Sequence, residues 1–274
     1  MAAIAGLPLV LAVVLVELAL GGAVLLWWLD RAGKAPDGFR KLVAVVDLVA
    51  IVMAAALAPT FPRGDLAAAA QLAAGPIASF GQALAVVAGL LLLQAVATFT
   101  PWRRFRDATG IAAAIAGAVA LGVAASARPS AAGVDAYPDL FATLALPIGA
   151  LALGGSNAAM LLGHWYLVTP KLSPAPLQQA ALVVVGAVVL QAVLVAVSVL
   201  RGELAGITQT ALWVAVALRV GVGILMTGGV ALAAWWTARM NTQSATGLLY
   251  VGLGCVLAGE VSARVVFYLT GAAL

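Results

Sequence analysis

Eight long apolar runs, separated by short polar connections, dominate the sequence. A membrane-spanning helix needs about 20 mostly apolar residues. Only 9% of the 274 residues are charged, whereas a soluble domain has roughly 25%. The sequence therefore predicts an all-α integral membrane protein, a bundle of eight transmembrane helices forming a single polytopic membrane domain, residues 1–274. The expected spans are about 7–29, 42–60, 79–99, 111–127, 141–168, 177–200, 211–236 and 245–272.

Two segments need a separate interpretation, one between two spans and one at the start of the chain. The stretch RGDLAAAAQLAAGP, 63–76, is too short to cross a bilayer and is bounded by proline and glycine, so it predicts a short helix at the membrane interface. The run 7–29 has no basic residue before it and no small-residue cleavage site after it. We therefore expect a helix that is retained and not a signal peptide.

The basic residues predict the orientation in the membrane, because cytoplasmic loops are rich in lysine and arginine. The odd-numbered connections together carry most of the lysine and arginine residues. The even-numbered connections carry one arginine each, Arg63, Arg128 and Arg201. Both termini are therefore expected outside. The net charge of +4 follows from this topology, so no nucleic-acid partner is expected. The basic connections hold Arg31, Lys34, Arg40 and Lys41, then Arg103, Arg104 and Arg106, then Lys171, then Arg239.

A few ionisable residues fall within the expected spans, where a charge costs a few kcal/mol and usually marks a site or a buried pair. At 1.5 Å of rise per residue, Arg219 lies roughly 12 Å from the outer end of its helix. Glu260 and Arg264 reach the same half, and Glu17 lies near the midplane. A second group, Asp47 and His164, lies toward the inner ends of its helices.

Glu260 and Arg264 are four residues apart, so they share a helix face in the favourable order of acid before base. One interpretation is a pair that neutralises itself and fixes helix packing. The other is a ligand-binding network, because Arg219 adds a second cation that needs Glu17 or a polar ligand to balance it. In the second group, Asp47, His164 and Tyr166 form a candidate inner proton relay. Alternatively, Trp165 and Tyr166 belong to an aromatic belt at the interface.

The inventory of residues excludes several kinds of chemistry. The single histidine cannot supply the two axial ligands of a bis-histidine haem, and the single cysteine supports neither a disulfide framework nor a thiolate metal site. No nucleotide-binding loop or hydrolase elbow is present. We therefore expect no haem or metal bound by this chain, and any chemistry would use an organic ligand from the bilayer together with protons.

The segment LAGEVSARVVFY resembles the last helix of the DmsC family, the membrane-anchor subunits of dimethyl sulfoxide reductases, within the wider NrfD-like group. The preceding helix matches at Arg219 in ALRVGVGIL, and the first helix is similar through ELALGGAVLL. The loop histidine of the family is absent, because that region reads APTFPRGD with Arg63, and Gln82 stands where the family often has an acid. The matching positions of the last helix are Ala258, Gly259, Glu260, Arg264, Phe267 and Tyr268.

The resemblance implies a haem-free anchor in the bacterial cytoplasmic (inner) membrane that binds menaquinol or ubiquinol. Such a subunit passes electrons to a ferredoxin-like iron–sulfur subunit, which is attached to a catalytic subunit that often contains molybdenum. On this interpretation Glu17 or Glu260 accepts a proton, and the other quinone-binding residues are Arg63, Gln82, Arg219 and Arg264.

Two other functions remain open. One is a structural or accessory subunit of a respiratory or photosynthetic complex, in which the missing loop histidine marks lost chemistry. The other is a proton-coupled transporter, with a relay from Asp47 and His164 to Glu17 and Glu260. Internal symmetry between the two halves would favour the transporter, but VELALGG compared with LALPIGALALGG indicates no convincing repeat.

Overall fold

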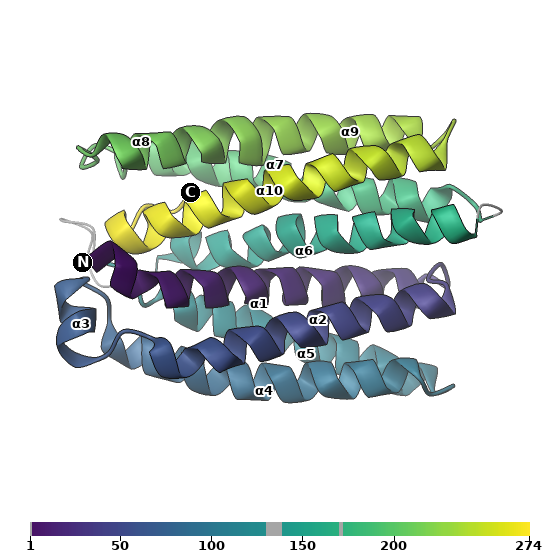
Figure 1. The fold of residues 1–274 in the computed structure, drawn as a ribbon, viewed down its shortest axis with the longest axis horizontal. Coiled ribbons are helices and arrows are strands. Elements are labelled where there is room, and N and C mark those ends of the chain that lie inside the picture. Colours follow the sequence, from purple (N-terminus) through teal and green to yellow (C-terminus); the bar gives the residue numbers. More distant parts are fainter. Residues whose placement is uncertain (1, 130–138, 170–171) are drawn as a thin grey trace.

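The computed structural model describes residues 2–129, 139–169 and 172–274 (Figure 1), so Lys171, used above to predict orientation, lies outside the described residues. Throughout these ranges the secondary structure is helical, and eight helices are long and apolar enough to cross a membrane. The prediction of an all-α protein with eight spans is therefore confirmed. The chain is a multi-pass membrane protein.

The helices end close to the expected positions, but several begin earlier: at Ala2, Asp37 and Ala74, five residues before the expected 7, 42 and 79, and at Arg103, eight residues before the expected 111. The short helix expected at 63–76 covers only Gly64–Ala69, because the next helix already begins at Ala74. Pro76 lies in the first turn of that helix, where the missing N–H costs nothing. The elements are α1 (Ala2–Arg31), α2 (Asp37–Leu57), η1 (Ala58–Thr60), α3 (Gly64–Ala69), α4 (Ala74–Thr98), α5 (Arg103–Ala125), α6 (Leu140–Val168), α7 (Ala175–Leu200), α8 (Thr210–Ala217), the π-helix η2 (Leu218–Met226), α9 (Thr227–Thr237) and α10 (Thr242–Thr270).

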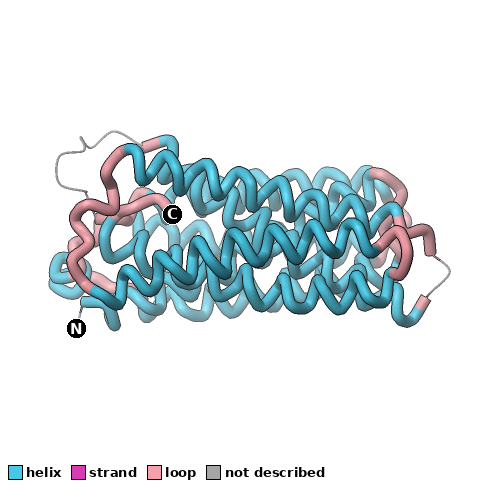
Figure 2. The backbone as a smooth tube through the Cα atoms, turned by 90° about the horizontal axis from the view of Figure 1, so that it is seen from above, coloured by secondary structure: helices cyan, strands magenta, loops and turns pink. Residues whose placement is uncertain are grey.

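The helices run along one common axis, and both chain termini lie at the same end of the bundle as α3 (Figures 1 and 2). We call this the α3 end. The opposite end, which we call the basic end, carries the connections that the sequence marks as basic. Its described residues include Arg31, Lys34, Arg40, Lys41, Arg103, Arg104, Arg106 and Arg239.

The eight spans form two four-helix bundles that lie side by side. The first contains α1, α2, α4 and α5, and the second contains α6, α7, the continuous α8–η2–α9 unit and α10. Within each bundle the first helix packs against the second and fourth, and the third packs against the same two. Since each bundle has an even number of spans, α1 and α6 start at the same end and run parallel.

The two bundles meet where α1 packs against α6. A Cβ on Gly21 would lie 1.8 Å from the carbonyl oxygen of Ala150, and one on Gly154 would lie 2.4 Å from the carbonyl oxygen of Leu18. Only glycine permits so close an approach of two backbones. Such contacts between small residues drive helix association in lipid, where no hydrophobic force does so.

The sequence of the first bundle is partly repeated in the second, at matching places in the fold. LALGG occurs at 18–22 in α1 and 151–155 in α6, and ATG occurs at 108–110 in α5 and 245–247 in α10. RGDLA at 63–67 corresponds to RGELA at 201–205, and both glycines have a positive φ, +50° for Gly64 and +72° for Gly202. The expectation that the two halves are not repeated is therefore corrected.

Candidate functional site

A network of buried ions is centred on Glu260 of α10. Its Oε1 accepts hydrogen bonds from Arg219 of η2 at 2.6 Å and from the amide of Gln191 of α7 at 2.5 Å. Its Oε2 accepts a hydrogen bond from Arg264, one helical turn away, at 2.8 Å. The four side chains are at most 1% exposed, so the hydrogen bonds within the network replace those with water.

Glu17 of α1 completes the balance of charge. Its Oε1 lies 2.8 Å from Nε of Arg264, although neither atom has a well-aligned hydrogen bond, and its Oε2 has no partner at all. Two carboxylates thus face two guanidinium groups, and Glu17 is one of the two alternatives that the sequence offered for balancing the second cation. A network that is neutral without a ligand also agrees with a purely structural role.

Close helix contacts position this network. A Cβ on Gly149 of α6 would lie 2.5 Å from Nη2 of Arg264 and 2.7 Å from Oε2 of Glu260. On the other side, a Cβ on Gly259 would lie 2.2 Å from Cα of Gly223, so α10 and η2 touch through their backbones. Arg219 lies in the first turn of this π-helical segment, an irregularity often found at functional sites. Glycine is therefore required on both sides of the ions.

The network lies where the sequence placed it along the helices. Arg219, Gln191 and Glu260 are nine or ten residues from the α3 end of their spans, roughly 14 Å at 1.5 Å per residue. Gln191 was not expected to take part. A lone amide in an apolar helix gives only a weak signal, and its partner becomes visible only once the helices are packed.

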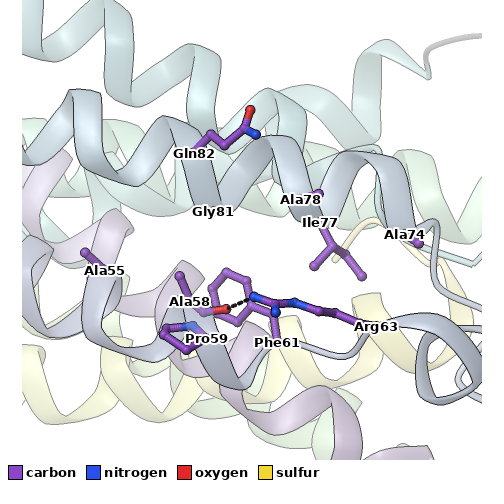
Figure 3. A pocket seen from close by; sticks show the side chains of 10 residues that line it. All are labelled: Ala55, Ala58, Pro59, Phe61, Arg63, Ala74, Ile77, Ala78, Gly81 and Gln82. Atoms are coloured by element: carbon purple, nitrogen blue, oxygen red, sulfur yellow. Dashed lines mark hydrogen bonds between the residues drawn. The ribbon is translucent and has the colours of Figure 1, made fainter.

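A pocket of about 460 Å³ lies apart from the network, between α2, η1, the connection that contains Phe61 and Arg63, and α4 (Figure 3). Its walls are mostly apolar and include Phe61 and Ile77, with Phe61 stacked on Phe80 at 5.8 Å between ring centroids. Arg63 and Gln82, two of the residues expected to bind a quinone, both line it. In Figure 3 the Gln82 side chain points away from Arg63.

Arg63 is the only arginine at the α3 end without an acidic partner among the described residues, since Arg128 and Arg201 both pair with Asp139. Its Nη2 makes one long hydrogen bond, 3.4 Å, to the carbonyl oxygen of Ala58. The pocket therefore offers a free cationic donor beside apolar walls.

The predicted site residues thus fall into two separate sets. Glu17, Glu260, Arg219 and Arg264 lie together between α1 and the second bundle. Arg63 and Gln82 lie in the first bundle, and none of the residues that line their pocket belongs to the network. A single site formed by all six side chains does not exist in the described structure.

The candidate inner relay is also divided. Asp47 is buried with no hydrogen-bond partner, and His164 is exposed with its Nδ1 2.9 Å from the hydroxyl of Tyr250. Tyr166 donates a hydrogen bond to the carbonyl oxygen of Ser173 at 2.5 Å. Among the described residues no hydrogen bond joins Asp47, His164 and Tyr166, so the three do not form a connected relay.

The segment GHWY, 163–166, instead holds the end of α6 against its neighbours. A Cβ on Gly163 would lie 2.7 Å from the hydroxyl of Thr246 in α10. The ring of Trp165 lies against Gly38 of α2, where a Cβ would be only 1.9 Å away. The motif therefore has a packing role at the junction of α2, α6 and α10.

Asp139 anchors an ion cluster at the α3 end, just outside the membrane-spanning part of α6. It accepts hydrogen bonds from Arg128 at 3.0 Å and Arg201 at 2.9 Å, and it caps α6 through the N–H of Phe141. Burial acts to raise the pKa of Asp139. The hydrogen bonds and the positive charges of the two arginines outweigh it and lower the pKa below its ordinary value of 3.8.

This cluster predicts a pH-dependent stability. Replacing Asp139 with asparagine keeps a helix cap but removes the charge, so we expect the protein to lose roughly 1 kcal/mol at neutral pH. A lowered pKa in the folded state stabilises it above the ordinary pKa of 3.8, and this contribution disappears as the pH falls further. Thermal unfolding of both proteins across acidic pH should therefore show the difference vanish. A difference that persists in acid would contradict this origin.

The described residues contain no group of three or more histidine, cysteine, aspartate or glutamate side chains that could hold a metal ion. The fold and its sites thus define a multi-pass helical membrane protein, built from two four-helix bundles with an ion network where they join. No family model, curated protein or solved structure matches the chain.

Proposed function

We propose that the chain is a haem-free membrane-anchor subunit that binds a quinol or quinone and exchanges electrons with an iron–sulfur partner subunit. The observation that carries the proposal is the pocket between α2 and α4, with a free arginine beside apolar walls. A quinone headgroup needs such walls and a few polar groups that orient it. Arg63 can donate a hydrogen bond to a quinone carbonyl, and Ile77 and Phe61 can contact the ring.

The electron acceptor must come from a partner, because the chain cannot bind an ordinary iron–sulfur cluster. Such a cluster takes four cysteine ligands, and the sequence has one cysteine and one histidine. A ferredoxin-like subunit attached to a catalytic subunit, with molybdenum as one option, would fill this role. The lysine and arginine bias predicts that the basic end faces the cytoplasm of a bacterium, which leaves the pocket and both termini outside.

The proton acceptor follows from the hydrogen bonds of the two buried acids. Both oxygens of Glu260 are occupied by donors, whereas Oε2 of Glu17 has none. We therefore favour Glu17 over Glu260 as the group that accepts a proton. Arg219 and Arg264 hold the acids in place and would bind the quinone only if it reached the network.

One observation favours a second function, a proton-coupled transporter. Many transporters consist of two parallel repeats related by an axis along the membrane normal. The two bundles described here have the same helix order, run in the same direction and share short sequence motifs. Transport by the purified chain in vesicles, with no redox partner present, would support this function over the first.

Substitution of Arg63 by glutamine tests the pocket. Loss of a charged hydrogen bond costs about 1.5–3 kcal/mol, so quinol oxidation by the intact complex should fall roughly 10- to 100-fold in kcat/KM. The matched control is Arg104→Gln at the basic end, where the arginine is exposed, and it should leave the rate unchanged. Equal rates for both variants and the wild type would contradict the assignment of this pocket.

The decisive experiment is purification with any partners intact, followed by quinone extraction and iron analysis. We expect a bound quinone, and iron that belongs to a second subunit. A preparation that contains neither, together with unchanged quinol turnover in Glu17→Gln, would overturn the proposed function.

A further inference from the structure

Asp47 lies near the middle of α2 and is in direct contact with α1. A Cβ on Gly22 would lie 2.2 Å from Oδ1 of Asp47, so the carboxyl group rests on the backbone of α1. The residue is 1% exposed, and neither carboxyl oxygen has a hydrogen-bond partner in the part of the chain that the structure describes. A buried polar group without a partner is rare in proteins and calls for an explanation.

The charged groups on the helices around Asp47 all have other partners. On α1, Glu17 pairs with Arg264 and Asp30 pairs with Arg40 and Arg106. Among the described residues no ion pair involves Asp47. On the remaining elements, Lys41 of α2 lies over the ring of Phe99, α4 has no titratable side chain and His164 of α6 faces Tyr250.

The second bundle contains a natural comparison for this position. In the repeated LALGG motif, Gly22 corresponds to Gly155, and a Cβ on Gly155 would meet Val184 of α7 at 3.8 Å. The contact between Gly22 and Asp47 is therefore matched by a contact between Gly155 and Val184. A valine is sufficient for packing at this place in the fold, so packing does not explain the carboxyl group.

Unpaired polar groups also follow the repeated glycines in α6. Ser156 and Asn157 come directly after Gly155, are at most 6% exposed, and carry a hydroxyl oxygen and an amide nitrogen without partners. At the corresponding places α1 has the apolar residues Ala23 and Val24. The two halves therefore differ in buried polar residues near the contact between α1 and α6. Asp47 lies on the α1 side of this contact, and Ser156 and Asn157 lie in α6.

We propose that Asp47 is a proton-binding site at the junction of the two bundles. An isolated carboxylate in an apolar interior is costly, whereas the neutral acid is far less so. Ionisable residues kept inside a membrane at such a cost are typical of proton relays. Glu17 lies five residues before Gly22, roughly 7.5 Å along α1, so the second buried acid belongs to the same helix at a neighbouring level. This site does not depend on quinone binding.

Two measurements on the intact chain in lipid nanodiscs test the site. The infrared spectrum should contain a carbonyl band of a protonated carboxylic acid that shifts in deuterated water and is absent in Asp47→Asn. Dicyclohexylcarbodiimide, an apolar reagent for protonated carboxyl groups, should label the peptide that contains Asp47. That labelling should decrease as the pH is raised.

The variant Asp47→Val copies the residue found in the second bundle and separates proton binding from packing. It should fold, with a melting temperature equal to or above that of the wild type, and lose both the infrared band and the label. A strongly lowered melting temperature would show that the carboxyl group is structural. An infrared band unchanged in Asp47→Asn, or labelling of Asp47 suppressed by sodium ions in place of protons, would overturn the proposal.

Discussion

Replacing Glu260 with glutamine is expected to lower the free energy of unfolding by about 3–5 kcal/mol. Removing one partner of a buried ion pair leaves an uncompensated charge, which costs this much. Here the acid lies between Arg219 and Arg264 and is 0% exposed. Glutamine has nearly the same shape as glutamate, so the decrease in the free energy of unfolding measures the effect of removing the charge. Unfolding of the variant by SDS titration in mixed micelles would measure it.

Combining Glu260→Gln with Arg219→Gln in a double variant tests whether the loss of stability comes from an uncompensated buried charge. The double variant retains Glu17 and Arg264, which face each other at 2.8 Å, and is neutral again. Its loss of stability should therefore be smaller than the sum of the two single losses, by about 0.5–3 kcal/mol. Asp65→Asn, at an exposed acid without an ion pair in the described structure, should have no effect. Strict additivity would contradict a coupled network.

Replacing Gly21 with valine should destabilise the contact between the bundles by at least about 3 kcal/mol. The new Cβ would lie 1.8 Å from the carbonyl oxygen of Ala150 and 2.8 Å from Cα of Gly154. These are backbone atoms, so the strain can be relieved only by moving α1 away from α6. The same SDS titration would measure the loss, and cross-linking between α1 and α6 would report the altered contact.

Gly186→Ala in α7 is the matched control, since a Cβ there would meet no atom within 4 Å. Alanine in a helix should leave stability unchanged or raise it by at most about 1 kcal/mol. If both glycine variants behaved alike, close approach of α1 and α6 would not be what joins the two bundles.

The spans could be predicted from the sequence because each depends on local composition. Twenty apolar residues must cross the bilayer as a helix, whatever they pack against. The boundaries were less certain: α4 begins at Ala74, before the expected 79, because Pro76 is tolerated in a first helical turn. The sequence predicts a short interfacial helix around RGDLA, whereas the equivalence of RGDLA with RGELA follows from the matching helix order of the two bundles.

The candidate site could be predicted only in part. The depth of Arg219 and Glu260 along their helices indicated a shared level, because helical rise is constant. Sequence could not show that Gln191 joins them, or that His164 faces Tyr250 and not Asp47. These pairings depend on which faces of the helices meet, and in lipid that is decided by backbone contacts between small residues.

The sequence by itself thus determined that the protein is a helical membrane protein with eight spans, and that Arg219 and Glu260 lie at the same depth along their helices. The tertiary structure alone decided how the ionisable residues are grouped. Among the described residues, it placed Glu17 with Glu260, left Arg63 without an acidic partner, and placed Asp47 against Gly22 without a hydrogen bond. The physical reason is that hydrophobicity and helical rise act along a single helix, whereas ion pairing depends on contacts between helices far apart in the chain.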